Sequence, residues 1–170
     1  MVTETLAGLG FKPYSLSERV REEARGRRLV IERDTLIAIG NELRFEEPII
    51  LARRTAELIL ADKPVHAVIE GIRNPAELIY LRKNLGAIIV AVDANEQIRL
   101  ARFLSRQRTD DPKTEADFWR INAIDLGRGE AVTGQQVAEC IMMADIHLTN
   151  EGTPADLVKA CQILIDSLSQ

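Results

Sequence analysis

The apolar positions of the chain follow two different spacings, and their order along the sequence predicts the fold. Residues 65–72 and 87–94 are continuous apolar runs of strand length, and residues 12–17 and 145–150 are shorter strand candidates. Between these strands lie stretches in which apolar residues recur every three to four positions, as in helices. Strands of this kind that alternate with helices are typical of a parallel sheet covered on both faces. We therefore predict an α/β fold with one parallel sheet between two layers of helices.

Several predicted helices carry residues that favour helix ends. Gly86 suits the end of one helix, Asn95 is an expected N-cap, and Thr153 followed by Pro154 suits the start of the last helix. Residues 3–8 are typical of the second half of a helix. The other predicted helices span residues 17–27, 33–45, 47–62, 75–86, 95–107, 114–126, 136–144 and 153–168. Together they predict a single domain over residues 1–170, with a polar, lid-like excursion at about 102–130.

The strand predicted at 65–72 ends in a charged pair. Sheets of this class bind ligands at the carboxyl ends of their strands. Glu70, Gly71 and Arg73 stand at that end, and Asn-Pro then opens a helix. In one interpretation Arg73 grips an anionic substrate, and Glu70 orients it or reaches a metal through water. In the other, the two residues form a surface ion pair of little energetic value.

The helix after the first predicted strand combines hydroxyl, carboxylate and guanidinium groups. Ser17 and Glu18 precede Arg21, and Arg25 lies one turn further on the same helix face. Two interpretations stay open. The helix either grips a phosphate group beside the sheet or is a solvated helix with Glu–Arg pairs.

A basic stripe and a turn complete the candidate residues. Arg102 and Arg106 lie one helical turn apart, and Arg108 follows them. Cations that close over a transferring phosphoryl group stabilise its charge and exclude water. A charged run is otherwise a solvated face. Asn150 and Gly152 follow the last strand and suit either a base-binding turn or ordinary turn chemistry.

Composition narrows the class of ligand. Of the 22 cationic residues 17 are Arg, the side chain best suited to bidentate contact with phosphate. A net charge of −4 and a pI near 5.3 argue against a nucleic-acid binder. Cys140 and Cys161 lie in apolar helical patterns and are expected to be buried, inert thiols, so no metal-binding residue is assigned. Without a signal peptide or a membrane-spanning run, we expect no membrane contact and a soluble, cytoplasmic protein.

The candidate segments, in their order and spacing, resemble a known family. YSLSERVREEA, RDTLIAIGNELR, VIEGIRNPAEL, AVDANEQIRLARFLSR, RTDDPKTEADF and ADIHLTNEGT together resemble the P-loop nucleoside- and nucleotide-monophosphate kinases, above all the archaeal adenylate-kinase-like and dephospho-CoA-kinase-like group. The resemblance covers nearly the whole chain from Thr3 onward. It implies a P-loop-kinase-like fold that transfers the γ-phosphate of ATP, with Mg²⁺, to a nucleotide or nucleotide-like acceptor.

The resemblance also implies roles on the acceptor side of the site. Arg21 falls where the substrate-side helix of these kinases carries a phosphate-binding Arg, with Ser17 and Glu18 beside it as substrate-binding residues. Glu18 stands where relatives often have Asp, which departs from the family pattern. Glu70 falls where an acidic residue serves the metal shell next to the substrate.

On the ATP side, the resemblance implies a cluster of cations and a base-binding turn. Arg102 and Arg106 fall in the lid helix that closes on the nucleotide phosphates, whereas Arg73 falls where the family Arg serves the substrate phosphate. These three residues and Arg108 are expected to stabilise the charge on the transferring phosphoryl group. Asn150 and Gly152 fall near the turn that contacts adenine, so they are the expected cofactor-binding residues.

One part of the family pattern is missing from this sequence. These kinases begin with a strand and a GxxxxGK[ST] loop, whose backbone N–H groups and Lys cradle phosphates at the start of a helix. Residues 3–11 resemble the rest of that helix, and no such loop occurs in the chain. The glycines near Lys12 are followed by Pro13 rather than by a helix, and residues 127–134 contain no Lys. We therefore expect little or no kinase activity from these residues.

The central first strand of the sheet would be missing with the loop. The neighbouring strands would then expose unpaired edges, through which the chain could form homo-oligomers. Three explanations stay open: a start codon assigned too late, a truncated gene with an inactive product, or a shortened protein that serves as a non-catalytic nucleotide-binding or interaction module. The acceptor is equally open among nucleoside monophosphates, nucleosides and dephospho-CoA.

Overall fold

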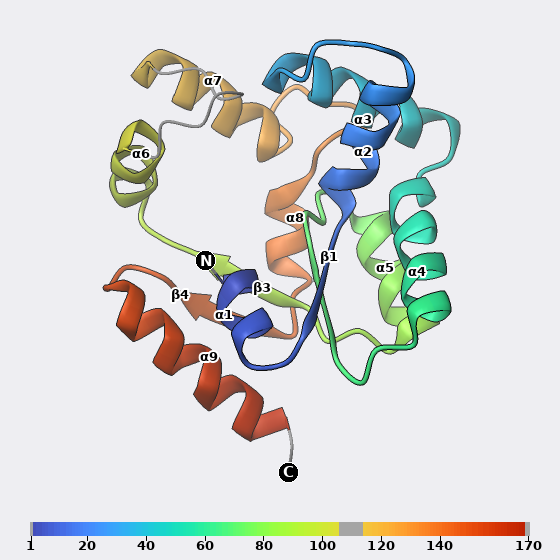
Figure 1. The fold of residues 1–170 in the computed structure, drawn as a ribbon. Helices are drawn as coiled ribbons and strands as arrows, with labels where there is room; N and C mark the ends of the chain where they lie inside the picture. Colours follow the sequence, from blue (N-terminus) through green and yellow to red (C-terminus); the bar gives the residue numbers. More distant parts are fainter. Residues whose placement is uncertain (1, 106–113, 169–170) are drawn as a thin grey trace.

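The computed structural model describes residues 2–105 and 114–168, which form nine helices and four short strands (Figure 1). In chain order the elements are α1 (Val2–Gly8), β1 (Lys12–Ser15), α2 (Leu16–Gly26), α3 (Arg33–Glu46), α4 (Ile50–Asp62), β2 (Ala67–Glu70), α5 (Pro75–Leu85), β3 (Val90–Asp93), α6 (Glu96–Ser105), α7 (Glu115–Asp125), α8 (Val137–Met142), β4 (Ile146–Thr149) and α9 (Pro154–Leu168). Every strand and helix predicted from the sequence is present, with shifted boundaries. The predicted extension of α6 to residue 107 lies outside the described residues.

The capping residues act as the sequence predicts. Asn95 Oδ1 accepts a hydrogen bond from the backbone N–H of Gln97 at 2.9 Å, and Gly86 ends α5 with a left-handed φ of +62°. At the start of α5, the Asn74 side chain and Glu77 form a reciprocal capping box. This box fixes the turn between β2 and α5, where the charged pair lies.

The four strands form two separate parallel pairs. β1 pairs with β2, with Lys12 opposite Ala67, and β3 pairs with β4, with Val90 opposite Ile146. Within the described residues each strand therefore has one hydrogen-bonded neighbour. The α/β class and the parallel direction are confirmed. Within the described residues the strands form two separate pairs rather than one continuous sheet, so the three-layer arrangement remains a prediction.

The strands are more exposed than their apolar composition predicts. Val68 and Ile69 of β2 are only partly buried, and Val92 of β3 is 38% exposed. The prediction that these strands are buried on both faces is wrong. A short two-stranded pair leaves one edge of each strand, and much of its faces, without a covering neighbour.

The apolar core is divided among the helices. The largest cluster joins α2, α3, α4 and α5 around the fully buried Leu16, Leu51 and Leu81. A second cluster belongs to α6 and α7, which stand to one side of α2–α5 in Figure 1. Its buried members are Leu100, Phe103, Phe118 and Ile121. The charged pocket described below is lined by residues of α1–α4, β1, β2 and the turn after β2.

Both cysteines are buried and form no disulfide, as predicted. Burial raises the pKa of the Cys140 thiol to about 12, which leaves it protonated at neutral pH. Among the described residues, no helix combines the length and apolarity needed to cross a bilayer.

Candidate functional site: an arginine-lined pocket

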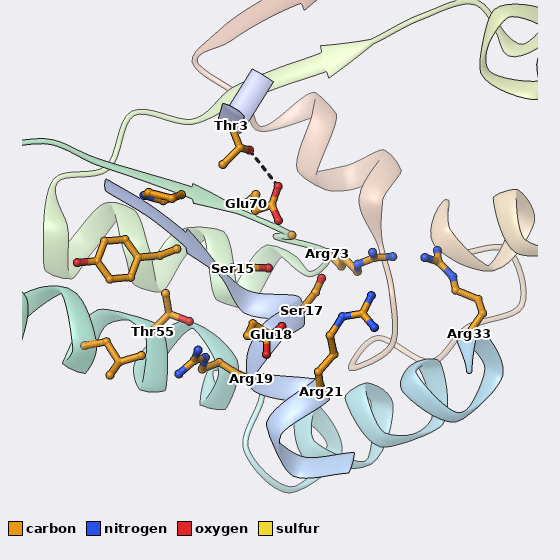
Figure 2. A pocket seen from close by; sticks show the side chains of 14 residues that line it. Thr3, Ser15, Ser17, Glu18, Arg19, Arg21, Arg33, Thr55, Glu70 and Arg73 are labelled. Carbon is orange, nitrogen blue, oxygen red and sulfur yellow. Dashed lines mark hydrogen bonds between the residues drawn. The ribbon is translucent and has the colours of Figure 1, made fainter. Parts of the chain in front are cut away.

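A cavity of about 750 Å³ opens at the carboxyl ends of β1 and β2 (Figure 2). We call it the arginine pocket. Its lining residues are Thr3, Pro13, Tyr14, Ser15, Ser17, Glu18, Arg19, Arg21, Arg33, Thr55, Leu58, Glu70, Gly71 and Arg73. Arg21, Arg33 and Arg73 point toward one another from α2, α3 and the turn after β2 (Figure 2). A polar cavity of this size with several guanidinium groups suits a small anionic ligand.

The turn after β2 approaches the start of α2 closely at Gly71. Gly71 has a φ of +83°, and a Cβ there would lie 2.8 Å from Ser17 Oγ and 3.3 Å from the Ser17 backbone nitrogen. Only glycine meets both conditions without strain. The two strand ends can therefore present Ser17 and Arg73 to the same cavity.

Arg73 is held on both its backbone and its side chain. Its backbone N–H donates to Glu77 Oε2 at 2.9 Å, and its Nη1 donates to Asp125 Oδ1 at 3.0 Å and to Gln135 Oε1 at 2.9 Å. Burial lowers the pKa of the Arg73 guanidinium, and the Asp125 carboxylate opposes that shift. A guanidinium remains cationic at neutral pH even so. Arg73 is therefore a positioned, partly desolvated cation.

Glu77 in turn is pinned by a second arginine. Glu77 is fully buried, Arg44 is 3% exposed, and Arg44 Nε donates to Glu77 Oε1 at 2.7 Å. Asn74 Nδ2 also donates to the carbonyl oxygens of Val132 and Gly134, both at 2.8 Å. These contacts fix the turn that carries Arg73 against α3 and the 132–134 loop.

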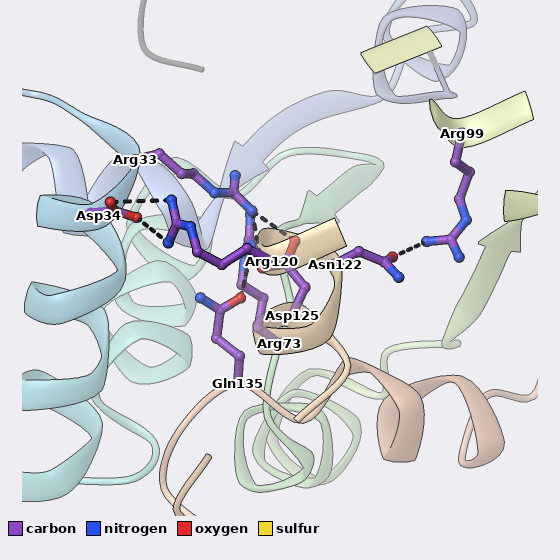
Figure 3. A network of polar contacts seen from close by, with 8 residues as sticks. All are labelled: Arg33, Asp34, Arg73, Arg99, Arg120, Asn122, Asp125 and Gln135. Atoms are coloured by element: carbon purple, nitrogen blue, oxygen red, sulfur yellow. Dashed lines mark hydrogen bonds and ion pairs between the residues drawn. The ribbon is translucent and has the colours of Figure 1, made fainter. Parts of the chain in front are cut away.

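Arg33, which the sequence analysis did not select, is a further cation of the pocket. Its Nη2 donates to Asp125 Oδ2 at 2.7 Å and to Oδ1 at 3.0 Å (Figure 3). The Nε of Arg33 is buried and makes no hydrogen bond within the described part of the chain. One signal could have found it: Arg33 is the first residue of α3, where the positive helix end disfavours a cation.

The residues predicted on α2 divide between the pocket and local ion pairs. Ser17, Glu18 and Arg21 all line the pocket. Glu18 is paired with Arg25 at 2.7 Å, and Arg19, also in the lining, pairs with Glu22 at 2.9 Å. The Glu–Arg pairs predicted for this helix are present, and the phosphate-binding interpretation remains a prediction for a helix that lines the pocket.

Glu70 makes a hydrogen bond that the sequence analysis missed. The hydroxyl of Thr3 donates to Glu70 Oε2 at 2.9 Å and brings α1 to the carboxyl end of β2. Among the described residues no group of three or more His, Cys, Asp or Glu could hold a metal ion. Glu70 and Thr3 fit a Mg²⁺ that takes few protein ligands and completes its shell with water and phosphate oxygens.

Three of the residues predicted on the ATP side, Arg102, Asn150 and Gly152, form a second group around the end of β4. Arg102 does not line the arginine pocket; it donates to the carbonyl oxygens of Asn150 at 2.6 Å and Gly152 at 3.2 Å. The Asn150 side-chain oxygen is buried and has no hydrogen-bond partner in the residues described. That oxygen fits the role of a group reserved for a ligand such as a base. Arg106 and Arg108, with part of the 102–130 excursion, lie outside the described residues.

Comparison with known proteins places the chain in a family. A UPF0200 protein of Hyperthermus butylicus is 31% identical over 144 residues, which are 84% of this chain and 74% of that protein. The chain belongs to the UPF0200 family. A second UPF0200 member, protein PF1294 of Pyrococcus furiosus, is 31% identical over 149 residues, covering 84% of this chain and 76% of the relative.

More distant UPF0200 relatives extend the match. The UPF0200 protein of Methanothermobacter thermautotrophicus is 27% identical over 100% of this chain and 84% of its own length. No protein-family model matches the chain. Because the UPF0200 name states no activity, the function must be argued from the arginine pocket.

Proposed function

We propose that the chain is a nucleotide-kinase-like phosphotransferase whose arginine pocket binds the acceptor. The reaction would transfer the γ-phosphate of ATP to a nucleotide or nucleotide-like acceptor. One observation carries this proposal: Arg21, Arg33 and Arg73 converge, from three different elements, on one cavity at the carboxyl ends of parallel strands. Converging guanidinium groups suit a phosphate, which they can bind bidentately.

In this proposal the pocket residues act by position and charge. Arg33 and Arg73 bind the acceptor phosphate, and Ser17 and Arg21 orient it from the start of α2. Phosphoryl transfer needs little covalent chemistry from a protein, because its barrier falls mainly through alignment of the reactants and stabilisation of negative charge. Desolvated, prepositioned cations such as Arg73 supply that stabilisation.

Mg²⁺ and ATP are the expected cofactor and donor. Glu70 and Thr3 are the residues that would hold Mg²⁺, which neutralises phosphate charge when it is bound. Asn150 and Gly152 would contact the base of ATP. No GxxxxGK[ST] run occurs within the 170 residues, so we expect these residues alone to use ATP slowly or not at all.

The strand pairing supports the kinase-like proposal. In the P-loop-kinase-like arrangement expected from the sequence, the first strand lies in mid-sheet. Removing it would leave one pair on each side, and β1–β2 and β3–β4 are two such pairs. A non-catalytic nucleotide-binding or interaction module is the alternative, favoured by the missing phosphate cradle.

Two measurements test the proposal. Calorimetric titration with AMP and dephospho-CoA should give binding to the 170-residue protein, and Arg73→Gln should weaken it at least about tenfold, the loss expected for one charged hydrogen-bonded contact. Arg53→Gln is the control, because Arg53, on α4, pairs with Glu47 at the end of α3 and with Glu57, and does not line the pocket. No binding of any phosphorylated acceptor would overturn the proposal.

The catalytic half is tested on the longer Pyrococcus furiosus relative. That protein should transfer phosphate from ATP to one of the same acceptors. Acceptor binding without turnover in that protein would replace the kinase assignment with the non-catalytic module.

A further inference from the structure

One carboxylate lies between two arginines of the pocket. Asp125 accepts two hydrogen bonds from Arg33 Nη2, at 2.7 and 3.0 Å, and one from Arg73 Nη1 at 3.0 Å (Figure 3). Gln135 Oε1 accepts a second bond from Arg73 Nη1 at 2.9 Å. Arginines bind a phosphate in the same arrangement, with two guanidinium groups around one anionic group.

Arg33 and Asp125 each lie at a helix end whose dipole disfavours their charge. Arg33 is the first residue of α3, near the positive end of that helix, and Asp125 is the last residue of α7, near a negative end. Each placement is unfavourable by the helix dipole. Arg33 and Arg73 carry two positive charges, and Asp125 carries one negative charge. The cluster of these three residues therefore keeps an excess of positive charge.

α7 is attached to the pocket mainly through charges. Its buried apolar side chains pack with those of α6, and among the described residues their cluster contains no residue of α2–α5. Toward α3, α7 makes the ion pair of Asp125 with Arg33 and that of Arg120 with Asp34, at 3.0 Å. Contacts of this kind can be exchanged for a ligand without opening an apolar core.

We propose that Asp125 and the phosphate group of a ligand compete for Arg33 and Arg73, so that ligand binding displaces the end of α7. The inference rests on the proposed function only in that the ligand carries a phosphate. Asp125 then lowers the affinity of the pocket for phosphate and couples its occupancy to α7. Such coupling is reciprocal: whatever releases α7 from the arginines strengthens phosphate binding.

The test uses inorganic phosphate as the probe and the single tryptophan of the chain as the reporter. Trp119 lies on α7, beside Phe118, and its indole donates to Glu115 at 3.1 Å. Phosphate should change Trp119 emission in the wild-type protein. In Asp125→Asn, phosphate should bind about tenfold more tightly, within the usual range of coupling between linked sites, and should change the emission little. Phosphorus NMR line broadening measures the affinity independently.

The control is Asp34→Asn, which removes the other ion pair between α3 and α7 and leaves Asp125 in place. It should raise phosphate affinity much less than Asp125→Asn does, because Asp125 remains in place to compete for the two arginines. An equal gain in Asp34→Asn, or no gain in Asp125→Asn, would overturn the competition. If Asp125→Asn does not fold, Arg33→Gln tests the same claim, since it should weaken phosphate binding and reduce the phosphate-dependent change in Trp119 emission.

The competition between Asp125 and phosphate and the proposed function can fail separately. Tighter phosphate binding by Asp125→Asn, with no phosphate transfer by the longer relative, would keep the competition and remove the kinase assignment. Phosphate transfer by the relative, with unchanged phosphate affinity in Asp125→Asn, would keep the kinase assignment and remove the competition.

Discussion

At the scale of single residues, the position of Arg73 depends on buried neighbours that never meet the ligand. Glu77 accepts from the backbone of Arg73 and from Arg44, and both Glu77 and Arg44 are almost inaccessible to solvent. A buried ion pair contributes little net stability compared with an apolar pair, but the loss of one partner leaves an uncompensated charge. These two residues are therefore sensitive sites in this chain.

Glu77→Gln should lower the free energy of unfolding by about 3–5 kcal/mol, because Arg44 stays buried without a carboxylate. Urea denaturation followed by circular dichroism measures the free energy of unfolding. The double variant Glu77→Gln, Arg44→Met should recover part of the loss. If the double variant is less stable than Glu77→Gln, the buried charge is not the cause.

Gly71→Ala should lower the free energy of unfolding by about 1–3 kcal/mol, since the added methyl group meets Ser17 and the backbone keeps a left-handed φ. It should also weaken acceptor binding, because Ser17 and Arg73 lose their relative positions. Gly8→Ala is the matched control. Gly8 ends α1 with no atom near the added Cβ, so its stability should stay within about 1 kcal/mol of the wild type.

At the scale of elements, the second strand pair is secured by one carboxylate before β4. Asp145 Oδ2 accepts from the backbone N–H of Ile89 at 2.8 Å, and Oδ1 accepts from Arg82 Nη2 at 2.8 Å. The Ile89 hydrogen bond first, and the Arg82 contact second, hold the pKa of Asp145 below its usual range. Asp145 thus joins the start of β3 to β4 and to α5.

This pKa gives the fold a dependence on acid. A carboxyl group with a folded-state pKa below the unfolded value, about 3.9, contributes stability above that value and loses it as the pH falls through the folded-state pKa. The melting temperature should therefore drop below about pH 4, and Asp145→Asn should flatten part of that drop. A pH profile of Asp145→Asn parallel to that of the wild type would show that the group does not contribute.

At the scale of the whole molecule, the divided sheet is the feature with the widest consequences. β2 and β3 each have one paired edge within the described residues, and Val92 is partly exposed on β3. Unpaired strand edges attract other strands, and charged residues such as Lys prevent this. A homo-oligomer formed through these edges remains a prediction from the sequence.

Sedimentation velocity at increasing protein concentration tests whether the chain forms a homo-oligomer through its strand edges. The wild-type protein should associate, and Val92→Lys should shift the equilibrium toward the monomer. Val158→Lys is the control, since Val158 is similarly exposed but lies on α9. Equal effects of the two substitutions would point to general surface hydrophobicity, and a monomer at every concentration would contradict the prediction.

The sequence by itself determined the local structure and predicted that the candidate site lies at the carboxyl ends of the strands. Asn95 and Gly86 mark helix ends through hydrogen bonds within a few residues, and the apolar runs mark strands, so these elements could be read directly. The Glu70–Arg73 turn could be assigned to the candidate site because parallel sheets bind ligands at the carboxyl ends of their strands. Arg33 and Asp125, 92 residues apart, meet only through the packing of α7 beside α3. Tertiary structure alone decided that contact, because it depends on which distant elements become neighbours.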